Sequence, residues 1–309
     1  LKDSGVALGA QSVCAESQGA FTGEVSATML KDVGCRYVLV GHSERRQLFG
    51  ECDALVARKF VAAQGQSLVP VLCVGETLEE REGDQTTSVV TRQLEAVLAV
   101  TEVRALAKAV IAARMIIFAY AGKFVDPTLG DKGFSGGVFE AQWRAALEGD
   151  MIDATPHQKR LYEKLIWAGR QVMENNQDRI NTKGVGWKNF LPAKWEREMG
   201  QVFTAKTGIV IKQPGRAYRS PVNVPDDAER AALVHYVKAG LNENAPIMKT
   251  EKWGKQEVYR HMEPIRLLPP CMGCHGKPKG ELDIVNFEKD GLEVGDVIGL
   301  MSVTLAVSD

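Results

Sequence analysis

The run Cys271-Met272-Gly273-Cys274-His275 is the feature that most restricts how this chain can fold. Two cysteines three positions apart, followed directly by a histidine, fit within one turn, so both thiols can form thioether bonds to one porphyrin while the imidazole ligates its iron. The alternatives are two ordinary turn cysteines or half of a zinc site, because C-x-x-C also occurs in zinc knuckles. Zinc needs four ligands, and no second C-x-x-C or C-x-x-H pair lies nearby in the sequence. We therefore predict one covalent haem c, anchored by Cys271 and Cys274, with His275 as the proximal iron ligand.

Length and composition limit the possible classes of protein. A chain of 309 residues is long enough for two domains. A hydrophobic content of 45% and a balance of 38 basic against 39 acidic residues exclude a disordered chain and the basic footprint of a nucleic-acid partner. No apolar run of about 18 residues occurs, so we expect no membrane span in this sequence. The sequence begins at Leu1 without a methionine or a signal peptide, which is typical of a fragment or a processed product.

The first part of the chain, 1–112, alternates short apolar runs with amphipathic stretches. The runs predict strands and the stretches predict helices, in the order strand Val6–Ala10, helix after Thr22, strand Tyr37–Val40, helix Ala54–Ala63, strand Val69–Val74 and helix Thr86–Ala99. Such βα units imply a parallel sheet covered on both faces, as in an α/β fold. The four cysteines of this part (Cys14, Cys35, Cys52 and Cys73) show no metal-ligand spacing and are interpreted as reduced structural thiols.

Three stretches of this part closely resemble triosephosphate isomerase: 19–26 (GAFTGEVS), 37–46 (YVLVGHSERR) and 70–77 (PVLCVGET). The resemblance implies an incomplete TIM-barrel-like segment. It also implies that His42 matches the neutral catalytic imidazole that polarises the substrate carbonyl, that Glu44 is the acidic residue beside it, and that the loop 14–23 inserts into a partner subunit. His42 follows an apolar strand directly, at the strand end where barrel enzymes place their chemistry.

The same comparison of motifs also shows departures from that family. Its barrel opens with an Asn and Lys pair on the first strand, whereas Leu1 already falls near the third. Its general base is a glutamate just after the sixth strand, whereas here Ala109–Ala112 begins that strand and runs into Ala113-Arg114-Met115. Without the lysine and the base we predict no isomerase activity from this chain alone. The alternative is an isomerase completed by another chain, in a homo- or hetero-oligomer that covers the open strand edge.

The second part of the chain is predicted to be a separate α+β domain, 155–309, joined through a linker at 113–154. Gly and Pro occur repeatedly between Gly122 and Gly149, and such breaks in periodicity favour a linker. Beyond it, helices are predicted at Thr155–Arg179, Pro192–Lys206 and Pro225–Ala239, and strands at Ile209–Lys212, Gln256–Arg266 and Val297–Val307. These elements predict helices packed on a small antiparallel sheet.

Several stretches of this part resemble the haem-binding PAS-like family of exported c-type haem domains. They are 188–193 (KNFLPA), 216–229 (RAYRSPVNVPDDAE), 262–265 (MEPI) leading into 271–276 (CMGCHG), and 295–299 (GDVIG) followed by Ser302-Val303. The resemblance implies an electron-transfer or redox/ligand-sensing domain, periplasmic or otherwise exported, whose partner is a redox or signalling protein. By the same resemblance, Arg216 or Arg219 is a candidate for contact with a haem propionate, because a guanidinium pairs well with a carboxylate.

The sequence does not identify the sixth iron ligand. The candidates are Met173, His261, His235 and His157. A lone histidine in a helix or strand is more often a packing residue than a ligand, and core packing is the default interpretation for Met173. Two strong axial ligands would favour electron transfer, whereas an open position would favour gas or redox sensing. We therefore predict a monohaem cytochrome domain fused to an inactive isomerase fragment. If the isomerase interpretation held instead, the protein would be cytoplasmic. A third interpretation is that the two halves were joined only in assembling the sequence.

Overall fold

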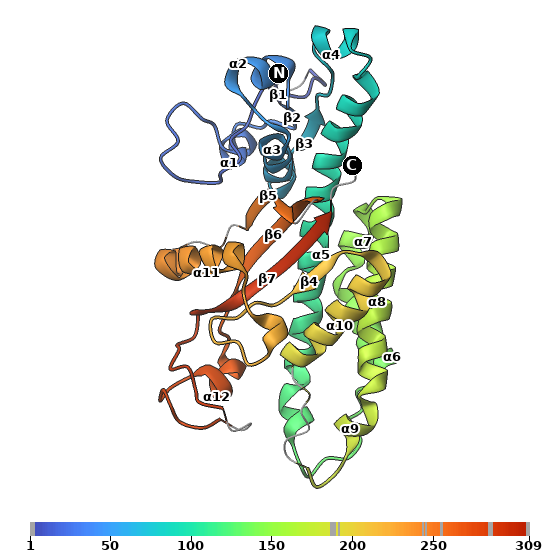
Figure 1. The fold of residues 1–309 in the computed structure, drawn as a ribbon, viewed down its shortest axis with the longest axis vertical. Helices are drawn as coiled ribbons and strands as arrows, with labels where there is room; N and C mark the ends of the chain where they lie inside the picture. Colours follow the sequence, from blue (N-terminus) through green and yellow to red (C-terminus); the bar gives the residue numbers. More distant parts are fainter. Residues whose placement is uncertain are drawn as a thin grey trace. The chain divides into compact units, whose positions relative to one another are not determined.

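The computed structural model describes residues 4–185, 190, 192–242, 244, 246–253, 256–283 and 287–306. The chain divides into two compact units. Figure 1 colours the chain in sequence order from the N-terminus to the C-terminus. The N-terminal unit comprises Leu1–Glu102 with Met248–Tyr259 and Val307–Asp309, and the C-terminal unit comprises Val103–Ile247 with Arg260–Ala306.

The N-terminal unit contains the predicted βα units. Strands β1 (Gly9–Ala10), β2 (Tyr37–Val40) and β3 (Val69–Leu72) form a parallel sheet in the order β1-β2-β3, with Tyr37 opposite Val69. The helices are α1 (Ala27–Asp32), α2 (Ser43–Phe49), α3 (Asp53–Gly65) and α4 (Leu78–Glu82). The parallel α/β prediction is confirmed, although the first strand covers only the last two residues of the predicted run.

Local capping explains where these helices begin. Ser26 accepts a hydrogen bond from the Met29 amide, and Thr77 forms a reciprocal capping box with Glu80, so orphan amides of α1 and α4 are satisfied. Among the described residues the sheet is not closed. It has three parallel strands, whereas a closed (β/α)₈ barrel has eight. Val69 and Val71, on one side of β3, are 45% and 42% exposed.

A single 40-residue helix, α5 (Thr86–Val125), follows the sheet and extends into the C-terminal unit. The predicted strand at Ala109–Ala112 is therefore wrong. An apolar run alone does not distinguish a buried strand from a buried helix. Here alanine-rich sequence favours the helix, and Ala109, Val110, Ala113 and Ile117 are fully buried at helical spacing.

The segment 113–154, predicted as a linker, is mostly helical. Its first residues complete α5, and α6 (Gly136–Ala146) and α7 (Glu148–Asp153) follow. Phe139 and Trp143 of α6 are both fully buried, so this segment contributes to the core of the C-terminal unit. Loop-like sequence is confined to the stretch between α5 and α6, where Ser135 caps α6 by accepting from the Val138 amide.

The C-terminal unit packs helices on a small mixed-length sheet. Its helices are α8 (Pro156–Asn175), α9 (Gln177–Asn181), α10 (Pro192–Thr207) and α11 (Asp227–Ala239), and its strands are β4 (Val210–Lys212), β7 (Val297–Ala306) and the larger part of β6 (Gln256–Arg266). Most of β5 (Ile247–Trp253) and the first residues of β6 belong to the N-terminal unit. The sheet order is β4-β7-β6-β5, and β4 and β7 are antiparallel with Ile211 opposite Val303 (Figure 1). The predicted α+β architecture is thus confirmed at this level. Of the predicted features, Val307 and the motif residues Lys188, Asn189 and Leu191 lie outside the described residues.

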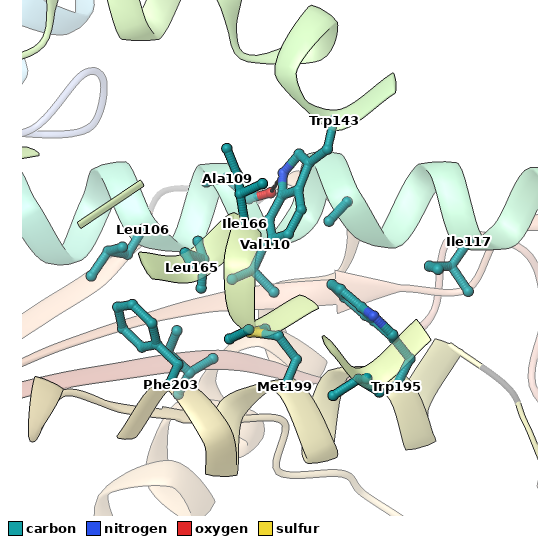
Figure 2. Close-up of a cluster of buried hydrophobic side chains, with 14 of the residues drawn as sticks. Leu106, Ala109, Val110, Ile117, Trp143, Leu165, Ile166, Trp195, Met199 and Phe203 are labelled. Atoms are coloured by element: carbon teal, nitrogen blue, oxygen red, sulfur yellow. Dashed lines mark hydrogen bonds between the residues drawn. The ribbon is translucent and has the colours of Figure 1, made fainter. Parts of the chain in front are cut away.

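An aromatic cluster forms the centre of this unit. Trp195, Met199 and Phe203 project from one face of α10 toward Leu106, Val110 and Ile117 of α5, with Trp143 of α6 packed beside them (Figure 2). The rings of Trp143 and Trp195 are T-shaped at 5.8 Å. The two indole N–H groups donate to the backbone carbonyls of Ala109 at 2.9 Å and Gly169 at 3.1 Å, so neither buried donor lacks a partner. In the part of the chain that is described, no helix is both long and apolar enough to cross a membrane.

Gly169 of α8 is required for this packing. A Cβ added there would lie 2.6 Å from the Trp143 ring and 2.9 Å from the Trp195 ring. Overpacking of this kind costs typically about 1–3 kcal/mol, so Gly169→Ala is expected to lower the free energy of unfolding by that amount in denaturant titrations. The control is Gly149→Ala on α7, where an added Cβ meets nothing within 4 Å. Equal effects of the two substitutions would contradict the packing argument.

Candidate functional site

Cys271, Cys274 and His275 lie in a single tight turn. The 3-10 segment η3 (Pro269–Cys271) leads into the short helix α12 (Met272–His275), and the i, i+3, i+4 spacing places the three side chains on one face. Both cysteines are free, and burial raises the pKa of the Cys274 thiol. Among the residues with described positions, no three His, Cys, Asp or Glu side chains converge as they would in a zinc site.

An apolar cavity of about 350 Å³ lies between this turn and α5. From α5, one helix face contributes Phe118, Ala121, Gly122 and Val125, spaced as neighbouring turns of a helix require. Cys271, Cys274 and His275 line the opposite side, together with Pro270. Among the described residues that line this cavity, Arg114 of α5 is the one with a permanent charge. The thiols and the imidazole therefore face a largely apolar space.

A second cavity, of about 250 Å³, adjoins the first and shares Arg114, Cys274, His275 and Ile298 with it. Its character is different, because its described lining contains no carboxylate and four cationic side chains, Arg114, Lys194, Arg197 and Arg219. Three of the four pair with carboxylates outside the lining: Arg114 with Glu196, Lys194 with Glu198 and Arg219 with Asp283. Cys274 and His275 therefore stand where an apolar cavity meets a cationic one. An anionic group in the second cavity would be stabilised by charge-assisted hydrogen bonds.

Arg219 and Arg216, the two alternative candidates for contact with a haem propionate, are engaged with the protein itself. Arg219 pairs with the buried carboxylate of Asp283 and donates to the Cys274 carbonyl at 3.0 Å, so it fixes the backbone of the motif from the rim of the second cavity. Arg216 donates to the Val297 carbonyl at 3.2 Å and lines neither cavity. Only Arg219 therefore lies where the prediction needed it.

Two residues that contact or line the candidate site were not identified from the sequence. His275 Nδ1 hydrogen-bonds the carboxylate of Asp290, fifteen positions further on, and no local pattern signals that contact. Arg114 forms a buried ion pair with Glu196 at 2.7 Å, with side chains 7% and 1% exposed. Burial raises the pKa of Glu196, and Arg114 only partly offsets this. The signal for Arg114 was present as the one cation within the apolar run 109–121.

The four candidates for a sixth iron ligand are not brought to the motif. None of Met173, His261, His235 and His157 lines either cavity. Met173 is buried in the core cluster, and His261 is buried on β6 with Nε2 at 3.2 Å from a Glu263 carboxylate oxygen. His235 and His157 are exposed on α11 and α8. In both cavities the described walls offer no further Met, His or Cys side chain.

The N-terminal unit has its own cavity, of about 550 Å³, lined by His42 and by the loops after β2 and β3. His42 precedes α2, and its Nδ1 accepts a hydrogen bond from the Glu44 amide at 3.3 Å. That bond leaves Nε2 as the protonated nitrogen of a neutral ring. Glu44 itself is outside the cavity lining, with a side chain 75% exposed and a carboxylate oxygen 4.0 Å from the ring.

Three of the carboxylates that line this cavity are held in ion pairs. Glu51 binds Arg45 and Lys59, Asp53 binds Arg46 and Arg92, and Glu76 binds Arg81. Burial alone would raise the pKa of Glu51, but the hydrogen bonds and charges of Lys59 and Arg45 outweigh it and lower the pKa. Carboxylates held in this way are poor general bases, which need a raised pKa near the working pH.

Comparison with known proteins links the first part of the chain to one family. A triosephosphate isomerase family model matches residues 1–114. The triosephosphate isomerase of Thiobacillus denitrificans is 55% identical over 127 residues (41% of this chain and 51% of that protein), and that of Dechloromonas aromatica is 62% identical over 112 residues (36% and 45%). The crystal structure of triosephosphate isomerase from Bartonella henselae is 45% identical over 31% of this chain and 41% of its own, with a TM-score of 0.31. The chain spans about half the length of the curated relatives it matches.

A second family model, described as Tll0287, matches residues 80–306. This match includes the segment 113–154 and the whole α12 region, and it overlaps the first match over residues 80–114. Most of the overlap falls within α5, so the two matches meet inside one continuous helix rather than in a loop.

Proposed function

Because the chain belongs to the Tll0287-like family through residues 80–306, we propose that its C-terminal unit is a monohaem c-type cytochrome domain. The domain would serve electron transfer or redox/ligand sensing, as its resemblance to the haem-binding PAS-like family implies. The observation that carries the proposal is the position of Cys271, Cys274 and His275 at the junction of an apolar and a cationic cavity. An incomplete triosephosphate isomerase segment precedes this domain.

The chemistry of the two cavities fits a haem. A haem presents an apolar ring edge and two carboxylates, and ligand sites typically combine apolar walls with a few placed polar groups. Phe118, Ala121 and Val125 supply the apolar wall. Lys194 and Arg197 line the cationic side, where propionates would gain charge-assisted hydrogen bonds. Arg219 takes a different role from the one predicted, because it holds the Cys274 carbonyl.

Each residue of the motif then has a role that its own chemistry permits. The Cys271 and Cys274 thiols would form the thioether bonds, and the Nε2 of His275 would bind the iron because its Nδ1 is already hydrogen-bonded. When bound, the haem supplies an iron centre that gains or loses one electron. The α5 face and Pro270 line that space with largely apolar atoms. Low polarity around a redox centre is one of the factors that set its potential.

Covalent attachment of haem is the first test. Co-expressed with a c-type maturation system, the full chain is expected to show a pyridine haemochrome spectrum that survives denaturation and a mass increased by one haem. The double substitution Cys271→Ala/Cys274→Ala should abolish both signals. The matched control, Cys52→Ala/Cys73→Ala in the N-terminal unit, should retain them. A colourless wild-type chain with the mass of its amino acids alone would refute the proposal.

Location and partner follow from the same chemistry. Haem is attached to C-x-x-C-H outside the cytoplasm in bacteria, so we propose a periplasmic or otherwise exported domain. Its partner would be a redox protein, or a signalling protein that responds to the haem state.

The alternative function is isomerisation of a triose phosphate by the N-terminal unit. The position of His42 in a 550 Å³ cavity favours it, but Glu51, Asp53 and Glu76 in that cavity are ion-paired. We expect the purified chain to show no interconversion of glyceraldehyde 3-phosphate above background in a coupled assay, and His42→Ala to change nothing. Turnover that His42→Ala abolishes would support an isomerase, completed by an oligomer that covers the open strand edge.

A further inference from the structure

We infer that Asp290 is a positioning residue for His275: it orients the imidazole and strengthens it as a ligand, thereby lowering the reduction potential of the haem. This inference rests on the proposed haem site. It concerns a contact outside the C-x-x-C-H motif, because Asp290 lies fifteen positions after His275. The contact is made between side chains that are both largely sheltered, at 26% exposure for His275 and 17% for Asp290.

The hydrogen bond fixes the tautomer of His275. It joins Nδ1 of the ring to Oδ2 of Asp290. An ionised carboxylate only accepts hydrogen bonds, so Nδ1 must carry the proton and donate it. Nε2 is then left with its lone pair free, which is the form that binds a metal. A carboxylate on the far nitrogen of a ligating histidine sets both ring orientation and basicity.

The backbone holds Asp290 in place beside the motif. The amide of Gly291 donates to the Gly276 carbonyl at 3.1 Å, and the amide of Leu292 donates to the carbonyl of His275 itself at 2.9 Å. These two bonds tie the segment carrying Asp290 to the residues that carry the ring. Gly291 has a φ of +77°, and a Cβ there would lie 2.7 Å from the Lys279 side chain, so the turn requires glycine. The contact is therefore part of the fold and not a chance meeting of surface side chains.

The contact with Asp290 should lower the reduction potential of the haem. Partial transfer of the Nδ1 proton toward Asp290 makes the imidazole more anionic and a stronger donor. A stronger, more negative ligand stabilises the oxidised iron relative to the reduced iron, and axial ligation with its hydrogen bonds is a principal determinant of haem potential. Asp290→Asn keeps the shape and an acceptor oxygen but removes the charge. The substitution should therefore raise the midpoint potential.

The test compares wild-type holoprotein with Asp290→Asn and with Glu288→Gln. Glu288 is exposed, two residues away, and its substitution removes the same unit of charge without touching the ring. We expect Asp290→Asn to favour reduction at least tenfold, a rise of 59 mV or more for a one-electron couple. Glu288→Gln should shift the potential by much less. The iron–histidine vibration of the reduced, ligand-free protein should fall in frequency in Asp290→Asn only.

The outcomes separate this inference from the proposed function. Wild-type protein without covalent haem would refute the haem site itself. Holoprotein in which both substitutions shift the potential equally, or in which the iron–histidine vibration does not move, would overturn the role of Asp290. If Asp290→Asn does not accumulate, the wild-type protein is tested by ¹⁵N NMR of labelled His275. We expect the Nδ1 proton to exchange slowly with solvent. Fast exchange of that proton would overturn the inference.

Discussion

Replacing Trp195 by alanine is expected to lower the free energy of unfolding of the C-terminal unit by about 3–5 kcal/mol, the usual cost of deleting a large buried aromatic side chain. Trp195 is fully buried, and its ring packs against Trp143 at 5.8 Å and Phe139 at 5.2 Å. Its loss would also leave the Gly169 carbonyl without the indole donor.

Trp167→Ala provides the control for this prediction. Trp167 lies on α8, is 41% exposed, and its main contact is the Lys206 ammonium 3.3 Å from the ring centroid. Cation–π pairs at exposed sites contribute about 0.5–1 kcal/mol, so a loss of roughly 1 kcal/mol is expected. The measurement is chemical denaturation followed by far-ultraviolet circular dichroism. Similar losses for both variants would show that the aromatic cluster does not organise this unit.

Replacing Arg114 by methionine is expected to cost about 3–5 kcal/mol at neutral pH, because it leaves the Glu196 carboxylate buried without its counterion. The Glu196 side chain is 1% exposed, and its second oxygen, Oε1, has no protein partner. Methionine has nearly the length of the arginine stem, so little packing is lost. The double variant Arg114→Met/Glu196→Leu removes both charges and should recover most of the stability.

The cost of Arg114→Met should depend on pH in a predictable direction. Burial holds the pKa of Glu196 above its ordinary value of 4.5, and removing Arg114 raises it further. Between the unfolded and the folded pKa, the folded chain holds a proton that the unfolded chain has released, so stability falls as the pH rises through that window. Denaturation at pH 4.5 and pH 7.5 should therefore show a smaller loss at the lower pH. A loss independent of pH would indicate that Glu196 is not the origin of the effect.

The strands other than β5, and the helices α3, α8, α10 and α11, were predictable because their signals are local. The capping boxes at Thr155 and Asp226 fix the starts of α8 and α11, and the αL glycine after α2 fixes its end. The apolar runs at Tyr37–Val40 and Gln256–Arg266 became β2 and β6. The stretch 109–112 was misassigned because an apolar run gives the same pattern in a buried strand and a buried helix, and neighbours decide between them.

The candidate site also contains residues that the sequence predicted and residues that only the structure revealed. The sequence by itself determined Cys271, Cys274 and His275, because the spacing of three reactive side chains within one turn is a local property. Only the tertiary structure decided which groups surround them: the α5 face, the cations of the second cavity, and Asp290. Those contacts join residues from 15 to about 160 positions apart, such as Asp290 or Arg114 with the motif. Such contacts cannot be predicted from local sequence, because they form only when separate segments of the chain pack against each other.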